Sequence, residues 1–180
     1  MLLLVGLGNP GSNYTNTRHN IGFKIIDAIN AHFKLSKQKP KFKGLLTTGN
    51  IDEKKIYAIK PLTFMNNSGT AIKELIDYFK INAKDVFVFH DDMDIDFGKI
   101  KAKFGGSSAG HNGIDSIDKF IGKDYSRVRV GIGHPKEKKK VNNHVLEDFK
   151  EDEEEKINEI TENIVKQLPT LIEKKIDLFS

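Results

Sequence analysis

Residues 1–11 read MLLLVGLGNPG, an apolar run that ends in a glycine-rich turn. The run does not alternate polar with apolar residues, so Leu2–Gly6 is predicted to be a short strand buried on both faces. The turn matches the G-x-G-x-x-G pattern of dinucleotide-binding loops. In such loops a helix begins at once, so that its first amides meet the pyrophosphate. Here residues 12–20, SNYTNTRHN, come before any helical pattern. We therefore expect a turn at a strand end and no nucleotide cofactor.

The other elements alternate between strand and helix periodicity. Helical spacing predicts helices over 21–33, around 72–79, over 111–122 and from 151, the last broken or kinked at Pro169. Further strands are predicted at 44–51, 55–61, 85–92, 98–106 and 125–133. Interleaved strands and helices indicate an α/β fold. We expect one globular domain over residues 1–180, a twisted mixed β-sheet flanked by helices on both faces.

Composition excludes several classes of protein. Of 180 residues, 38% are hydrophobic and 30% charged, and none is cysteine. Disulfides, a thiolate nucleophile and cysteine-ligated zinc are thus excluded. No apolar run reaches the ~20 residues of a membrane span, and residues 1–10 do not resemble a secretory signal. No heptad pattern or large apolar stripe suggests an obligate partner. These features predict a cytoplasmic monomer.

A histidine and an aspartate are the first candidates for chemistry. Asp91 stands where the apolar strand VFVFHDD, residues 86–92, emerges at its carboxyl end. Open α/β sheets place their sites at this edge. His19 lies in the loop after the first strand, so both side chains are expected to reach it. A histidine oriented by a carboxylate is a general base that can activate water near neutral pH.

Asparagines gather in loops that follow predicted strands. They are Asn9, Asn20, Asn66, Asn67 and Asn112. Asparagine is common at turns and helix N-caps, which accounts for Asn67. Several carboxamides around a His–Asp pair would also bind amides and stabilise an oxyanion. They point to a peptide-like or ester substrate.

Basic residues predict the partner. Lys99, Lys101 and Lys103 alternate along one strand, and Arg127 and Arg129 along another. The glycine-rich segment 105–113, GGSSAGHNG, lies between the two strands and offers backbone amides to anions. Lys136, Lys138, Lys139 and Lys140 extend the basic surface. Two basic strands beside such a turn favour a phosphate backbone, hence nucleic acid.

Two other motifs offer alternative chemistry. Residues 106–110, GSSAG, fit the G-x-S-x-G pattern of a serine hydrolase with Ser108 as nucleophile. Asp118, Asp124, His134 and His144 follow in the chain order of such a triad. Residues 92–96 have the aspartate spacing of a calcium loop, but Phe97 replaces its glycine and Lys103 its closing glutamate. A magnesium site made from these acids stays open.

Four blocks together resemble the bacterial-type peptidyl-tRNA hydrolase family over nearly the whole chain. They are GLGNPGSNYTNTRHNIG at 6–22, KPLTFMNNSG at 60–69, HDDMD at 90–94, and GSSAGHNGIDSI at 106–117 with RVRVGIGHP at 127–135. The chain departs from the family at Asp115, where a basic residue is common.

The resemblance implies a role for each matching residue. His19 would be the catalytic base paired with Asp91, with Asn66 and Asn112 placing water and steadying the oxyanion. Asn9 would hold the peptide, and His111 would lie by the acceptor end. Tyr14 and Met65 would line the groove, and Lys101, Lys103 and Arg129 would clamp tRNA phosphate. No metal or cofactor is expected.

The expected activity is hydrolysis of the ester between a peptide and the 3′-terminal ribose of tRNA. The substrate and partner would be peptidyl-tRNA dropped from ribosomes. Two alternatives remain: a serine hydrolase that uses Ser108, and an RNA-binding module without catalytic activity.

Overall fold

A mixed seven-stranded sheet runs through the middle of the computed structural model, which describes residues 1–137, 141–174 and 179. The strands lie in the order β2-β3-β4-β1-β5-β7-β6. Their bounds are β1 Leu2–Gly6, β2 Lys39–Lys41, β3 Gly44–Ile51, β4 Lys54–Pro61, β5 Val86–Asp92, β6 Ile100–Phe104 and β7 Ser126–Gly131. The central strands β4, β1, β5 and β7 are parallel, and the strands outside them are antiparallel.

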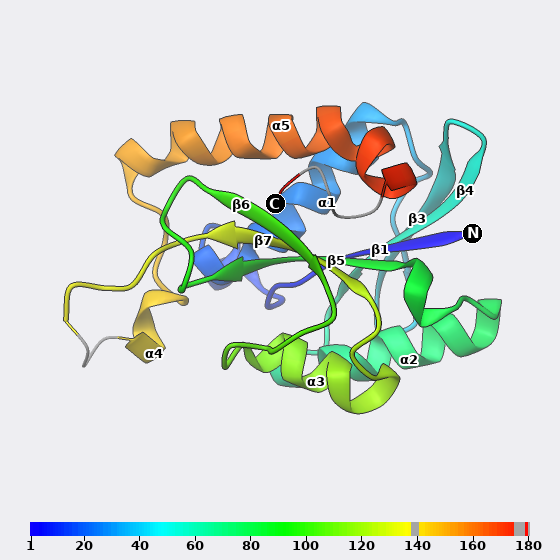
Figure 1. Ribbon diagram of the computed structural model, residues 1–180, viewed down its shortest axis with the longest axis horizontal. Coiled ribbons are helices and arrows are strands. Elements are labelled where there is room, and N and C mark those ends of the chain that lie inside the picture. Colours follow the sequence, from blue (N-terminus) through cyan, green and yellow to red (C-terminus); the bar gives the residue numbers. More distant parts are fainter. Residues whose placement is uncertain (138–140, 175–178, 180) are drawn as a thin grey trace.

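Helices cover both faces of the sheet (Figure 1). α1 (Ile21–His32) and α5 (Glu151–Lys174) lie on one face, and α2 (Ser68–Phe79) and α3 (Asn112–Ile121) on the other. The short helix α4 (Val141–His144) stands beside the sheet. Each face has its own apolar core, because the central strands carry apolar side chains on both sides. The predicted single-domain α/β fold with a mixed sheet is confirmed.

Alternation along β5 shows how the strand serves both layers. Phe87 and Phe89 belong to the core beneath α1 and α5, whereas Val88 belongs to the core above α2 and α3. All seven residues of β5 are buried, as the unbroken apolar run predicted. Its last residues, His90 to Asp92, therefore emerge from a strand that is held on every side.

Two elements differ from the sequence-based expectation. β2 and α4 were not predicted, because three and four residues are too few for a periodic pattern. The last helix continues through Pro169 to Lys174 and changes direction near its red end in Figure 1, which agrees with the kink that was one of the two predicted outcomes. Among the described residues, no helix combines the length and apolarity needed to cross a bilayer.

Short 3₁₀ helices form much of the loop structure at the carboxyl edge of the sheet. They are η1 (Ser12–Tyr14), η2 (Arg18–Asn20) and η3 (Met65–Asn67), while η4 (Ala83–Asp85) precedes β5 at the opposite end. η2 and η3 run directly into α1 and α2. This arrangement gives the predicted site residues of the loops a rigid backbone.

Candidate active site

A cavity of about 410 Å³ opens at the carboxyl edge of the parallel strands. Its walls come from the loop after β1, from η2 and η3, from the end of β5, from residues 108–112 and from the segment after α4. These segments are far apart in the sequence. They meet here because parallel strands end at the same edge of the sheet.

His19 and Asp91 meet in this cavity, as the sequence predicted. Nδ1 of His19 lies 2.9 Å from both carboxylate oxygens of Asp91. The backbone amide of His19 donates to the carbonyl of Val145 at 2.8 Å. The buried guanidinium of Arg18 contacts the carbonyl of His144 and the carboxylate of Glu153. The segment after α4 thus holds the backbone on which His19 is mounted.

The carboxylate of Asp91 is buried but remains charged. Burial by itself raises the pKa of this carboxyl. The imidazoles of His19 and His111, together with hydrogen bonds from both, outweigh burial and bring the pKa well below its ordinary value. Asp91 is therefore an anion throughout the pH range in which an imidazole titrates.

His111 binds the other side of the same carboxylate. Its Nε2 lies 2.9 Å from Oδ1 of Asp91. Its Nδ1 accepts hydrogen bonds from the backbone amides of Gly113 and Ile114, at 3.1 and 3.3 Å, and so caps α3. An atom that accepts from amides carries no proton, so the proton of a neutral His111 ring must be on Nε2. His111 therefore donates to Asp91.

His90 lies beneath this pair. Burial is the main cause that lowers the pKa of His90 well below its ordinary value, so the ring is neutral. Its Nδ1 donates to the backbone carbonyl of Asp91 at 2.7 Å. Its ring meets that of His111 edge to face, with 4.9 Å between the centroids. Asp91 is thus held by its backbone as well as by its side chain.

His19, Asp91 and His111 have the composition of a metal site, with ligand atoms within 4.8 Å of one another. The hydrogen bonds of His111 argue against that use. A metal on Nε2 would displace the proton to Nδ1, where it would face two amide protons of α3. The three residues fit a proton-sharing group better than a metal centre.

The whole chain is similar to proteins of one family. The family model of peptidyl-tRNA hydrolase matches residues 3–179. A peptidyl-tRNA hydrolase from Pelagibacter ubique is 71% identical over 100% of this chain and 97% of its own. One from Ehrlichia ruminantium is 46% identical over 98% of this chain and 91% of its own. The chain belongs to the peptidyl-tRNA hydrolase family.

A solved structure agrees with this assignment. The crystal structure of peptidyl-tRNA hydrolase from Acinetobacter baumannii superposes with a TM-score of 0.91 at 34% identity. The superposition covers 97% of this chain and 90% of the Acinetobacter baumannii chain. The similarity therefore includes the sheet, the helices on both faces and the edge at which the cavity opens.

Three asparagines of the predicted site line the cavity. Asn9 is buried, and its side-chain oxygen accepts from the amide of Met65 at 2.8 Å. Asn66 and Asn112 are exposed at the wall. Asn20 serves the structure instead, since its side chain bonds both the amide and the carbonyl of Asn9. Asn67 does not line the cavity.

Of the three residues that the resemblance places along the groove or by the acceptor end, two line the cavity and one does not. Met65 and His111 line the cavity. Tyr14 does not, but its ring meets that of Phe64 edge to face at 6.5 Å, and Phe64 does line it. Tyr14 therefore contacts the rim of the cavity through Phe64.

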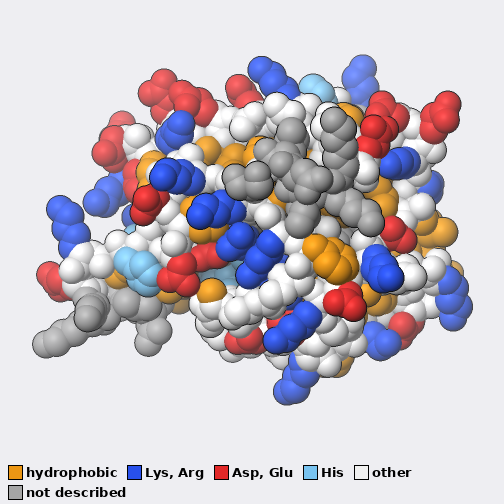
Figure 2. Space-filling view, in the orientation of Figure 1, with side chains coloured by type: hydrophobic (Ala, Val, Ile, Leu, Met, Phe, Trp, Pro, Cys, Tyr) orange, Lys and Arg blue, Asp and Glu red, His pale blue; other side chains and the backbone are white. Residues whose placement is uncertain are grey.

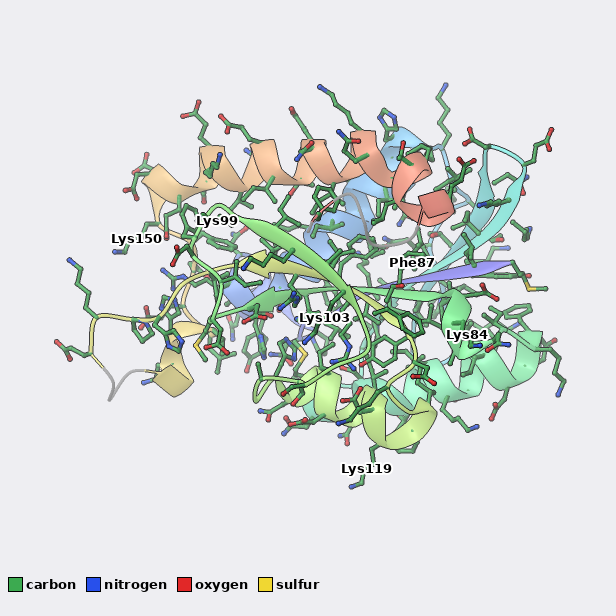
Figure 3. The ribbon with its side chains drawn as sticks, in the orientation of Figure 1. Lys84, Phe87, Lys99, Lys103, Lys119 and Lys150 are labelled. Atoms are coloured by element: carbon green, nitrogen blue, oxygen red, sulfur yellow. The ribbon has the colours of Figure 1, made fainter. Side chains whose placement is uncertain are left out.

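The predicted basic strands pair with each other across β6 and β7. Lys101 lies opposite Arg129, and Lys103 opposite Arg127. Figure 2 shows Lys and Arg side chains gathered above these strands, and Figure 3 places Lys103 in the middle of that face. Burial and the charges of Arg129 and Arg127 lower the pKa of Lys103. Like charges placed opposite each other destabilise a sheet, which favours binding of an anion here.

Arg127 does not join the basic surface that was predicted from its strand. It is 1% exposed, and its guanidinium donates to Asp118 at 2.9 Å and to the carbonyl of Ser107 at 3.1 Å. Strand alternation alone does not show that α3 covers this side. Of the other lysines predicted on this surface, Lys136 is exposed, while Lys138, Lys139 and Lys140 lie outside the described residues.

Within the part of the chain that the structure describes, neither alternative motif makes the contacts that its chemistry needs. The amide of Gly110 donates to the hydroxyl of Ser108 at 3.4 Å. The histidines that would complete a triad are used elsewhere, His134 by Asp94 and His144 by the carbonyl of Ile132. Asp118 binds Arg127 and Tyr125. The acids of the supposed calcium loop likewise pair with cations, Asp92 with Arg129 and Asp96 with Lys99.

Phe64 and Leu146 line the cavity but were missed from the sequence. Both are large apolar side chains left open to solvent, 54% and 45% exposed. Phe64 also has φ 61° and ψ 157°, a strained conformation for a residue with a side chain. A strained, exposed aromatic ring at a cavity rim indicates a contact surface for ligand. The sequence signal was only an isolated aromatic in a loop.

Proposed function

We propose that this chain hydrolyses the ester between a peptide and the 3′-terminal ribose of tRNA, with His19 as general base and Asp91 as its orienting partner. The observation that carries the proposal is the contact between Nδ1 of His19 and Asp91 inside a cavity. Because Nδ1 faces the carboxylate, Nε2 is the nitrogen left to accept a proton. Family membership supports peptidyl-tRNA as the substrate.

The proposed reaction begins with proton transfer. Nε2 of His19 takes a proton from water as the water oxygen attacks the ester carbonyl. The His19 imidazolium is stabilised by the Asp91 anion, which keeps its charge because its pKa is held low. The tetrahedral intermediate then collapses, and the proton passes from Nε2 to the leaving ribose oxygen. Each proton that His19 takes is returned, so the enzyme is unchanged.

Asparagine side chains suit the developing oxyanion. Asn66 and Asn112 stand at the cavity wall and present NH₂ donors without a charge of their own. The oxygen of Asn9 already accepts from Met65, which leaves its NH₂ group to donate to the peptide portion. Uncharged donors of this kind stabilise charge that appears only in the transition state.

The basic pairs of β6 and β7 suit the tRNA. Lys101, Lys103 and Arg129 lie on the paired strands β6 and β7, next to β5, whose end lines the cavity, and would bind phosphates near the acceptor end. Backbone contacts of this kind position a nucleic acid without reading its sequence. We also propose that the single domain works as a cytoplasmic monomer, since peptidyl-tRNA arises where ribosomes translate.

A hydrolysis assay tests the proposal directly. Purified protein should release N-acetylated amino acid from N-acetylaminoacyl-tRNA and leave intact tRNA. Full activity should persist after EDTA treatment, because the proposed reaction uses only water and side chains of the protein, and the hydrogen bonds of His111 disfavour a metal on its ring. Binding of tRNA without release of the acyl group would identify an RNA-binding module instead.

Replacing Asn66 with alanine should lower kcat by about 10²–10³, the usual loss for one oxyanion donor. Asn112→Ala should lower kcat to a similar extent, because it removes the second proposed oxyanion donor. The variant should still fold, because alanine is tolerated at the first position of α3. The matched control is Asn67→Ala, since Asn67 adjoins Asn66 but does not line the cavity. Equal activity of the two η3 variants in steady-state kinetics would refute the proposed role of Asn66.

Replacing Lys101 or Lys103 with alanine should raise KM for peptidyl-tRNA and leave kcat nearly unchanged. Each lost phosphate contact should also reduce the salt dependence of binding, by about one unit of log–log slope. Lys119→Ala is the control, because this lysine points away from the sheet on α3 (Figure 3). If all three variants have the same salt slope, β6 does not hold the tRNA backbone.

A further inference from the structure

We infer that His111 is a positioning residue, locked in one tautomer, that orients Asp91 and does not act as a ligand of the acceptor end. The inference rests on the proposed function, because Asp91 matters only if His19 is the base. Its physical basis is that both nitrogens of the ring are engaged within the protein. The side chain is 8% exposed, so little of the ring is open to a ligand.

The lock comes from the N-terminus of α3. Two backbone amides, those of Gly113 and Ile114, point at Nδ1. Protonation of Nδ1 would break both hydrogen bonds and put a positive charge against the positive end of the helix. The ring is therefore held neutral, with its proton on Nε2. The other neutral tautomer and the charged ring both carry a proton on Nδ1, so either would leave α3 without its cap.

The locked proton decides how Asp91 meets His19. One oxygen, Oδ1, accepts from His111, while Nδ1 of His19 lies 2.9 Å from both oxygens. The carboxylate cannot rotate without losing the His111 hydrogen bond. The rings of His19 and His111 also lie close together, and their centroids are 4.8 Å apart. Asp91 thus presents a fixed acceptor to Nδ1 of His19.

The same ring ties the base to the oxyanion site. Asn112 is the first residue of α3, the helix that His111 caps. One imidazole thus contacts the carboxylate that orients the base and sets the start of the helix that carries Asn112. Among the described residues, the titratable groups in contact with the His111 ring are His19 from η2 and His90 and Asp91 from β5, and the charge of Arg127 from β7 acts on His90.

Two substitutions separate the two hydrogen-bonding roles of the ring. Asparagine places an oxygen near the position of Nδ1 and is a strong N-cap, but it does not reach Asp91. Glutamine places an NH₂ group near the position of Nε2, so it keeps the donor to Asp91 and loses the cap. His111→Asn should therefore keep the wild-type Tm, whereas His111→Gln should lower it.

Activity should follow the opposite order. His111→Asn should lower kcat by about 10–100-fold with KM unchanged, the effect of losing one hydrogen bond to a charged group. The Asp91 anion, with one donor fewer, would hold the His19 imidazolium more tightly. The acid limb of the kcat profile should therefore move to higher pH. His111→Gln should recover most of kcat and the wild-type limb. A purely structural role would leave the limb unmoved.

Two results would overturn the inference. One is a raised KM with unchanged kcat in His111→Asn, which would make His111 a substrate ligand. The other comes from ¹⁵N NMR of the histidine rings in the wild-type protein without substrate. We expect a neutral His111 ring with an unprotonated Nδ1, and a protonated Nδ1 would refute the lock. Because this spectrum needs no turnover, it decides whether the His111 tautomer is locked even if the wild type fails to hydrolyse peptidyl-tRNA, a failure that would refute the proposed function and leave the lock standing.

Discussion

Replacing Asp91 with asparagine is expected to lower kcat for peptidyl-tRNA hydrolysis by about 10⁴, the order known for the carboxylate that orients a catalytic histidine. The reason is the fixed proton of His111. It donates to the atom at the Oδ1 position, so the amide oxygen must turn toward His111. The NH₂ group then faces Nδ1 of His19. That nitrogen must accept, and the proton of His19 moves to Nε2, where the base should be.

The loss should not be a loss of folding. In Asp91→Asn the buried polar groups of His19, His111 and the new asparagine all still have hydrogen-bond partners, so Tm should change little. Binding of uncharged tRNA should also be retained, because the basic residues of β6 and β7 are not altered. Single-turnover assays with Tm and tRNA affinity measured in parallel test this. Retention of more than about a tenth of wild-type kcat would show that Asp91 does not set the tautomer of His19.

Replacing His19 with alanine is expected to lower kcat by about 10²–10⁴, the range for removal of a general base. KM should stay close to wild type, since the remaining groups of the cavity still bind substrate. A small base such as imidazole, added to the assay, should restore part of the rate to His19→Ala. The site is open enough at its wall to admit such a molecule.

Ser108→Ala is the control for this experiment. Ser108 lines the cavity, but its hydroxyl has no histidine partner among the contacts of the described residues. Its activity should be near that of wild type. If instead Ser108→Ala is inactive and His19→Ala is active, the enzyme is a serine hydrolase. Labelling of Ser108 by a fluorophosphonate would support that same conclusion.

Much of the site could be predicted because it lies at strand ends. Asp91 ends a strand whose apolar run is visible in the sequence, and His19 follows the first strand. The rule that parallel strands share a carboxyl edge then brings the two side chains together across 72 residues. The asparagines and the basic residues were found from their places in loops and strands, and the four sequence blocks added their individual roles by resemblance.

Arg127 and Asn20 show where such prediction fails. Arg127 alternates with valines exactly as Arg129 does in the sequence pattern, yet Asp118 of α3 covers it. Asn20 is an asparagine like Asn9, but its side chain is hydrogen-bonded to the backbone of Asn9 in the first loop and does not line the cavity. Period and residue type say which way a side chain points, and they do not say what lies there.

The amino-acid sequence by itself determined the helices and strands other than β2 and α4, the mixed sheet and the edge that carries the site, because these follow from periodicity along the chain. Only the tertiary structure decided that the cavity is lined by Phe64 and Leu146 and that His111 donates its proton to Asp91. The proton position depends on two amides of α3 that point at one nitrogen. Such directional contacts between separate elements are set by packing in three dimensions, which no local pattern encodes.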